Sequence, residues 1–200
     1  MFGIIQKRGE RNVTKRQKAT QDLTLIAVSV AIMTVCAYIS VPFFSGVAFS
    51  LQLFAVFLCS AILSPRQSLL SILIYLALGL IGAPVFAGFR GGFSVLLGAT
   101  GGFLIGFIPA SIIIPLAKKH FGGRRAATLS AMALSLAICY LIGTLWFVAV
   151  SGADRQIGLW GALLACVVPY LLPDLIKLAL AFYLSERISP LLEKINCRFC

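Results

Sequence analysis

Long apolar segments, separated by short polar or glycine-rich stretches, make up most of this chain. The apolar runs cover residues 23–40, 49–63, 67–81, 100–116, 126–150 and 172–188. They are continuously apolar, unlike the strands of a membrane barrel, in which apolar and polar residues alternate. Most of them are close in length to the about 20 residues that a membrane-spanning helix needs. The pattern therefore predicts an all-α integral membrane protein with six transmembrane helices.

The region before the last run allows two interpretations. Residues 158–168 are apolar, but Pro169 and Pro173 interrupt the stretch. Proline is tolerated in the first turn of a helix and kinks a helix interior. We expect a short lead-in helix followed by a sixth span over residues 172–188. The alternative is one long helix from Gly158 that is kinked at Pro173.

Basic residues gather at the ends of the apolar runs and set the expected topology. They precede the first run, fill the loop at residues 118–125 and follow the last run, whereas the opposite side holds only Arg90 and Arg155. Cytoplasmic flanks of membrane helices are enriched in lysine and arginine, so we expect both termini in the cytoplasm of a multi-pass cell-membrane protein. The expected domains are a basic N-terminal tail over 1–21, a six-helix membrane domain over 22–189 and a C-terminal tail over 190–200.

Composition supports a lipid-embedded chain and argues against nucleic acid as a partner. Hydrophobic residues make up 60% of the sequence and charged residues only 12%, which is too few to coat a soluble domain. The net charge of +11 could indicate a nucleic-acid binder, but the basic residues form membrane flanks and not an aromatic-interleaved face. The lipid bilayer is therefore the expected surrounding, and no nucleic acid is expected.

A glycine-rich segment lies between the third and fourth runs. Nine glycines fall between Gly79 and Phe107, and Arg90 is the single charged residue there. Irregular backbone at membrane depth must be buried in protein or line a cavity, because unpaired amides are costly in lipid. The segment is therefore a candidate binding site. Its candidate ligand contacts are Phe86, Arg90, Gly91, Gly92 and Phe93.

Asp174 and Lys177 are ionisable residues inside the last apolar run. Their spacing of three residues puts both on one face of a helix. Charges inside a membrane are costly, so they normally pair with each other or line a functional site. A self-neutralising structural pair is one interpretation, and a polar ligand site is the one that we favour.

Three further polar side chains lie within apolar helices. Gln52, Tyr75 and Tyr140 can each bind a polar ligand edge, and each can equally bond to a neighbouring helix. Arg90 has two interpretations as well. Its guanidinium suits a carboxylate, although an interfacial arginine can also face lipid headgroups. We keep all four residues as candidate ligand contacts.

Several catalytic signatures are absent from the sequence. No G-x-x-x-x-G-K-[ST] motif occurs, so this chain does not hydrolyse ATP. The single histidine, His120, lies in the basic cytoplasmic loop, so a Ser–His hydrolase is not indicated. Cys197 and Cys200 form one isolated C-x-x-C, which is weak support for a metal site. We expect a binding protein without metal or cofactor.

Three stretches carry a resemblance to a known family. They are SLQLFAVFL at 50–58, YLALGLIGAPVFAGFRGGFSVLLGATGGFLIGF at 75–107 and PYLLPDLIKLALA at 169–181. In these residues and their spacing the chain resembles the BioY family, the substrate-binding S components of energy-coupling-factor (ECF) biotin transporters. The likeness spans about residues 23–188. Phe89 and Ala99 stand where the family often carries glycine and proline.

The resemblance implies a six-helix protein that binds biotin near its outer face. It also implies two kinds of partner, a transmembrane coupling subunit and a pair of cytosolic ATPases. Members tend to carry an A-x-x-x-A pattern in the first helix that meets the coupling subunit, and Ala27 and Ala31 match it. Small residues four apart allow close helix approach.

The candidate residues suit the chemistry of biotin. A carboxylate such as Asp174 can accept ureido N–H bonds, and either Arg90 or Lys177 can meet the tail carboxylate. Phe86 and Phe93 can enclose the apolar body. The remaining alternatives are an intramembrane enzyme using Asp174 as a base, a purely structural subunit, and an uptake subunit for another small vitamin-like carboxylate.

Overall fold

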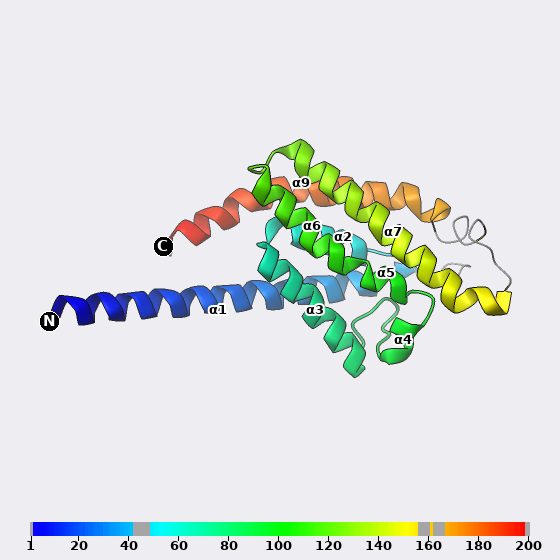
Figure 1. Cartoon of the computed structure of the whole chain (residues 1–200), viewed down its shortest axis with the longest axis horizontal. Coiled ribbons are helices and arrows are strands. Elements are labelled where there is room, and N and C mark those ends of the chain that lie inside the picture. Colours follow the sequence, from blue (N-terminus) through cyan, green and yellow to red (C-terminus); the bar gives the residue numbers. More distant parts are fainter. Residues whose placement is uncertain (1, 42–48, 156–160, 162–166, 199–200) are drawn as a thin grey trace.

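The computed structural model describes the backbone of residues 2–41, 49–155, 161 and 167–198, and these residues are almost entirely helical (Figure 1). The helices are α1 (Phe2–Tyr38), α2 (Gln52–Ile62), α3 (Pro65–Ile81), α4 (Phe93–Leu97), α5 (Gly101–Ile105), α6 (Phe107–His120), α7 (Arg125–Arg155) and α9 (Val168–Arg198). Two short strands, β1 (Ser40–Val41) and β2 (Phe49–Ser50), form an antiparallel pair between α1 and α2.

Helix α2 lies at the centre of the bundle. It packs against α1, α6 and α9, and eight of its 11 residues are buried. Phe57 on α2, Ile72 on α3 and Ile114 on α6 are fully buried in the core around it. The central position of α2 explains why its sequence is apolar on all sides, since a helix that is hydrophobic all round belongs in a core or a membrane.

The two ends of the bundle differ. Both termini and the turn between α6 and α7 lie at one end, where α1 and α9 extend beyond the other helices (Figure 1). The β1–β2 pair, α4 and α5 lie at the opposite end (Figure 1). Lys118 ties the first end together, because its Nζ donates to the carbonyl of Ala61 and to Oγ of Ser189. The glycine-rich segment and the basic loops are thus separated along the bundle axis.

Over the ranges that the structure describes, four helical stretches are long and apolar enough to cross a membrane, which confirms the expected helical membrane character. They are Arg16–Tyr38, Gly101–His120, Arg125–Val150 and Val168–Leu192. The other two expected spans form shorter apolar helices, Gln52–Ile62 and Pro65–Ile81.

Helix boundaries differ from the prediction at both ends of the chain. The first helix begins at Phe2 and not near residue 23, because residues 2–22 contain no proline and are rich in helix-forming lysine, arginine and glutamine. The last helix starts at Val168, with Pro169 in its first turn, and continues to Arg198 through Pro173 and Pro190. The expected lead-in helix, and its alternative starting at Gly158, lie mostly outside the described residues.

The second and fourth helices also begin differently from the prediction. Phe49 and Ser50 pair with β1, so α2 starts only at Gln52. The expected helix over residues 100–116 is divided at Gly106 into α5 and α6. A Cβ on Gly106 would lie 2.9 Å from Sγ of Cys139 on α7, so glycine is needed for the close approach of the two helices.

Candidate binding site

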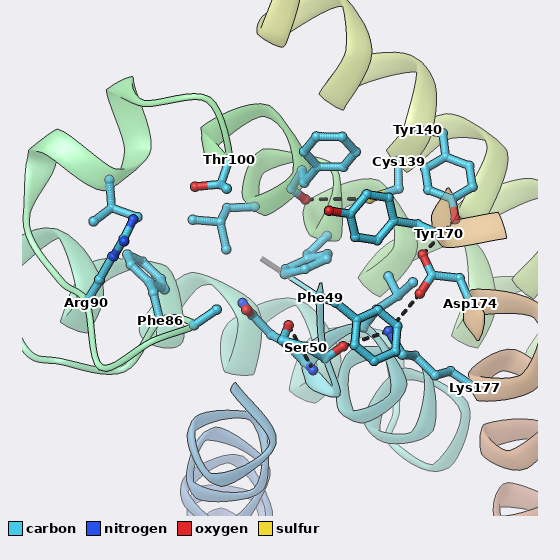
Figure 2. A pocket seen from close by; sticks show the side chains of 17 residues that line it. Phe49, Ser50, Phe86, Arg90, Thr100, Cys139, Tyr140, Tyr170, Asp174 and Lys177 are labelled. Atoms are coloured by element: carbon cyan, nitrogen blue, oxygen red, sulfur yellow. Dashed lines mark hydrogen bonds and ion pairs between the residues drawn. The ribbon is translucent and has the colours of Figure 1, made fainter. Parts of the chain in front are cut away.

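A cavity opens at the end of the bundle opposite the termini. Its walls come from β2, the start of α2, the glycine-rich loop, α4, α5, α6, α7 and α9 (Figure 2). The lining residues are Phe49, Ser50, Gln52, Leu53, Phe86, Ala87, Arg90, Val95, Thr100, Phe103, Leu104, Phe107, Cys139, Tyr140, Tyr170, Asp174 and Lys177.

Asp174 and Lys177 form a buried ion pair at one side of the cavity. The side chains are 9% and 6% exposed, and Lys177 Nζ lies 2.8 Å from Asp174 Oδ1. The Tyr140 hydroxyl on α7 donates to the other carboxylate oxygen, Oδ2, over 2.6 Å. Both oxygens of Asp174 therefore already accept a hydrogen bond, and the pair carries no net charge. An ion pair with further hydrogen bonds offsets part of the cost of burying the two charges.

Lys177 also holds the β2 strand over the cavity. Its Nζ donates to the carbonyl of Ser50 over 2.7 Å and lies 3.7 Å from the centre of the Phe49 ring. The Phe49 ring in turn stacks on Tyr170 at 6.4 Å between centroids. A cation over an aromatic face is attracted by the ring quadrupole. The ammonium group thus connects α9 to β2, which lies 127 residues earlier in the chain.

Arg90 lies on the other side of the cavity, together with Phe86 (Figure 2). The two residues face each other across a tight turn, in which the Phe86 amide donates to the Arg90 carbonyl over 2.9 Å. Phe86 is 1% exposed, whereas Arg90 is exposed. Among the described residues, none forms an ion pair or hydrogen bond with the Arg90 guanidinium. Arg90 thus adds a second cationic side chain to the cavity lining, besides Lys177.

Gln52 contributes a buried amide to the cavity wall. It is the first residue of α2, is 4% exposed, and its Nε2 has no hydrogen-bond partner among the described residues. A buried amide without a partner is uncommon and costs free energy. The amide therefore has unused donor capacity beside the cavity.

Glycines position the apolar wall formed by Phe103, Leu104 and Phe107. A Cβ added to Gly102 would lie 2.2 Å from Cβ of Trp146, and one on Gly143 would lie 2.4 Å from the Phe103 ring. The missing side chains let α5 and α7 come close together, and Trp146 Nε1 donates to the Gly98 carbonyl over 3.1 Å. These contacts hold α5, which carries Phe103 and Leu104, closely against α7.

Six of the predicted ligand contacts line the cavity and four do not. Gln52, Phe86, Arg90, Tyr140, Asp174 and Lys177 line it. Tyr75 is fully buried, and its hydroxyl donates to the Val85 carbonyl over 2.7 Å, so it binds the backbone of the glycine-rich loop and does not contact the cavity. Phe93 on α4 is 63% exposed, outside the lining.

Gly91 and Gly92 also lie outside the lining, and they shape the loop. A Cβ on Gly91 would lie 2.1 Å from the Ala83 carbonyl oxygen. Gly92 has φ +97°, a conformation that L side chains rarely adopt, and its amide donates to the Gly79 carbonyl over 2.6 Å. Both glycines therefore allow the loop to fold back on the end of α3.

Several lining residues were not predicted from the sequence. Phe49, Ser50 and Tyr170 flank or belong to the stretches that carry the family resemblance, which is a signal that could have indicated them. Phe103 and Phe107 are apolar residues in an apolar helix, so their pattern does not distinguish a cavity wall from a lipid face. Within the part of the chain that the structure describes, no group of three His, Cys, Asp or Glu residues could hold a metal ion.

Ala27 and Ala31 do not line this cavity. Both are exposed on α1, on a face that no described element covers. Asp22, five residues before Ala27, accepts a 2.5 Å hydrogen bond from Gln67 at the start of α3. The two alanines therefore lie in the middle of the stretch of α1 between Asp22 and Tyr38.

The fold and the cavity define a helical membrane protein with a ligand-sized site at one end of its bundle. The chain belongs to the BioY family, whose sequence profile matches residues 10–194. A probable biotin transporter BioY of Pyrococcus horikoshii is 38% identical over 84% of this chain and 96% of its own length. The biotin transporter BioY of Thermotoga maritima is 34% identical over 86% of this chain and 97% of its own length.

Two more proteins are similar. The biotin transporter BioY of Rhodobacter capsulatus is 33% identical over 84% of this chain and 93% of its own length. The crystal structure of the S-component for biotin from an ECF-type ABC transporter is 24% identical, with a TM-score of 0.79 over 87% of this chain and 93% of that one. This structure supports the fold. The relatives are named transporters, and none supports the intramembrane enzyme considered above.

Proposed function

We propose that this chain is the substrate-binding S component of an ECF transporter, that it captures biotin at the outer face of the cell membrane, and that it needs other subunits for uptake. Membership of the BioY family and the names of its relatives support biotin as the ligand. The sequence carries no nucleotide-binding motif, so in this proposal ATP hydrolysis comes from a partner ATPase pair, linked through a transmembrane coupling subunit.

One observation supports the pose of the ligand: the cavity has a neutral polar side and a cationic side. Lys177 is neutralised by Asp174, while the Arg90 guanidinium is without a described partner. An unpaired guanidinium binds a carboxylate bidentately. Biotin therefore places its tail carboxylate at Arg90 and its uncharged ureido ring at Asp174, Lys177 and Tyr140.

Gln52 completes the recognition of the ring. Its buried Nε2 is a free donor in the cavity wall, and the ureido carbonyl is an acceptor of matching chemistry. The spare lone pairs of Asp174 accept the ureido N–H groups, because a carboxylate can take more than the two bonds already present. Phe86, Phe103 and Phe107 enclose the thiophane ring and the valeryl chain.

We place six helices across the bilayer, with both termini in the cytoplasm. The termini and the basic α6–α7 turn lie at one end of the bundle, as an even number of crossings requires (Figure 1). That end carries the lysines and arginines that favour the cytoplasm. The cavity then opens toward the outer face, and the exposed pair Ala27 and Ala31 faces the coupling subunit.

Binding to the purified full-length chain tests this function. Biotin at about 100 times its Kd should stabilise the folded protein by ~2.7 kcal/mol, measured as a shift of the melting temperature in detergent. Lipoate shares the valeryl carboxylate without the ureido ring, and biotin methyl ester keeps the ring without the charge. Biotin alone should bind tightly. Equal binding of lipoate would favour another vitamin-like carboxylate, and no shift with any of the three would refute the proposal.

A further inference from the structure

The glycine-rich loop carries one residue in a conformation that its side chain disfavours. Phe89 has φ +58°, and among the described non-glycine residues it is the one with positive φ. A bulky residue in this left-handed region is strained, and such strain persists only where surrounding contacts hold it. A glycine would adopt this backbone conformation without strain but has no side chain. The side-chain contacts of Phe89 are therefore what distinguishes it from a glycine at this position.

Two contacts hold the tip of this loop to the end of α1. The Phe89 ring stacks on Tyr38, the last residue of α1, with 4.2 Å between centroids and 25° between ring planes. The neighbouring Gly88 amide donates to Oγ of Ser40 on β1 over 3.0 Å. Phe89 is nevertheless 64% exposed, so the loop tip is held by one ring face and one hydrogen bond and is not buried in the core.

The same loop tip connects both sides of the cavity. Phe86 and Arg90, directly before and after the tip, line the cavity on one side (Figure 2). Ser40 on β1 pairs with Ser50 on β2, whose carbonyl accepts the bond from Lys177 on the other side. Releasing the tip would thus free the segment that carries Arg90 from the strand pair that covers Lys177.

We propose that the Tyr38–Phe89 stack is a latch: it holds the glycine-rich loop closed against α1 and β1, and it sets how fast a ligand enters and leaves the cavity. The latch acts on the closed loop whether or not the cavity is filled. Breaking it therefore speeds association and dissociation together and leaves Kd nearly unchanged. A residue that touches the ligand would instead mainly change the dissociation rate. This inference rests on the proposed function for its ligand, biotin, but not for the loop closure itself.

The test compares Tyr38→Ala, Phe89→Ala and the double variant in the full-length chain. Each single change should raise both rate constants for labelled biotin about two- to tenfold, as expected for loss of one aromatic pair. The double variant should be no faster than the faster single one, because both changes remove the same contact. Leu97→Ala, an exposed position on nearby α4, is the matched control and should keep the parental rates.

A ligand-free measurement separates this inference from the proposed function. Without biotin, amide hydrogen exchange of the peptide covering residues 84–92 should be faster in Tyr38→Ala and Phe89→Ala than in the parent or in Leu97→Ala. Faster exchange in a chain that does not bind biotin would support the latch and refute the biotin proposal. Parental exchange and parental rate constants in both variants, or a double variant whose effects add, would overturn the latch.

Discussion

Tyr140 donates a 2.6 Å hydrogen bond to Asp174, and so joins α7 to α9 at the wall of the cavity. The second oxygen of Asp174 accepts from Lys177, so the carboxylate receives a donor from its own helix and one from a neighbour. Few other contacts join these two helices. The bond therefore both orients the carboxylate toward the cavity and helps to set the distance between α7 and α9.

Removing this hydroxyl should cost stability even without ligand. Tyr140→Phe keeps the ring and should lower the free energy of unfolding by ~1–3 kcal/mol, because a hydrogen bond to a buried charge is lost. The melting temperature in detergent measures this effect. Tyr183→Phe is the control, since the Tyr183 hydroxyl meets Arg187 on the exposed part of α9. Equal melting temperatures for both variants would contradict the role of Tyr140.

The buried pair gives a second prediction, on the carboxylate as a ligand contact. Asp174→Asn preserves the shape and should weaken biotin binding by ~1–3 kcal/mol, because a charged acceptor becomes a neutral one. Binding of labelled biotin to the folded fraction measures the effect.

Lys177→Met is the companion variant to Asp174→Asn. It leaves the carboxylate buried without its counterion, just as Asp174→Asn leaves the buried ammonium without one. Each single variant should therefore lower the free energy of unfolding by ~3–5 kcal/mol, and the folding yield with it. The double variant should regain part of that stability. If both single variants lose yield equally while the surviving protein binds biotin as the parent does, the pair is structural and not part of the site.

The helix spacing of Asp174 and Lys177 made their pairing predictable, because i and i+3 always share a helix face. The partners from elsewhere in the chain were not predictable. Ser50 lies 127 residues before Lys177, and nothing in its local sequence indicates that its carbonyl meets an ammonium group. Tyr75 and Tyr140 illustrate the same limit. Both are tyrosines in apolar helices, yet one points into the loop backbone and the other at the cavity carboxylate.

Boundaries were less predictable than the helices themselves. Each apolar run coincides with helix among the described residues, since burial and lipid contact both demand apolar residues. Four of these helical stretches are long and apolar enough to cross a membrane. The break at Gly106 and the pairing of Phe49 with Val41 depend on tertiary contacts, with α7 and with β1. A glycine in an apolar run fits a continuous helix equally well, so its role becomes visible only with the neighbouring helix in place.

Arg90 leads to a third prediction, on the tail carboxylate. Arg90→Ala should abolish most of the preference for biotin over its methyl ester, because the guanidinium attracts the charge that the ester lacks. Arg90→Lys should restore part of it, since the charge returns without the planar fork. Competition of the two compounds for labelled biotin measures the preference. Arg66→Ala, an exposed arginine at the other end of the bundle, is the control. An unchanged preference in Arg90→Ala would assign the carboxylate to Lys177 or to water.

The glycine-rich loop gives a fourth prediction, on folding. Gly91→Ala would place a Cβ 2.1 Å from the Ala83 carbonyl oxygen, which belongs to rigid backbone, so the loop must shift. We expect loss of ~2 kcal/mol or more of stability, as for other overpacked positions, together with weaker biotin binding. Gly122 also has a positive φ, but open space surrounds it. Gly122→Ala should therefore lower the free energy of unfolding by only about 1 kcal/mol and leave biotin binding intact. Similar melting curves for the two variants would show that the loop yields easily.

The last prediction concerns energy coupling. Ala27 and Ala31 lie one turn apart on the exposed face of α1, and neither lines the cavity. Small side chains allow close packing of helices within a membrane, and a bulky residue prevents it. Replacing both alanines by tryptophan should therefore reduce ATP-driven biotin uptake about tenfold or more while equilibrium binding stays near the parental value.

Val28 and Val35 are also exposed on α1, and Val35→Trp tests whether any bulky residue on this helix has the same effect. Uptake in proteoliposomes containing the coupling subunit and the ATPase pair gives one readout, and biotin binding to the isolated chain gives the other. Full uptake by the double variant, or loss of binding in parallel with uptake, would show that the coupling subunit docks on a different face.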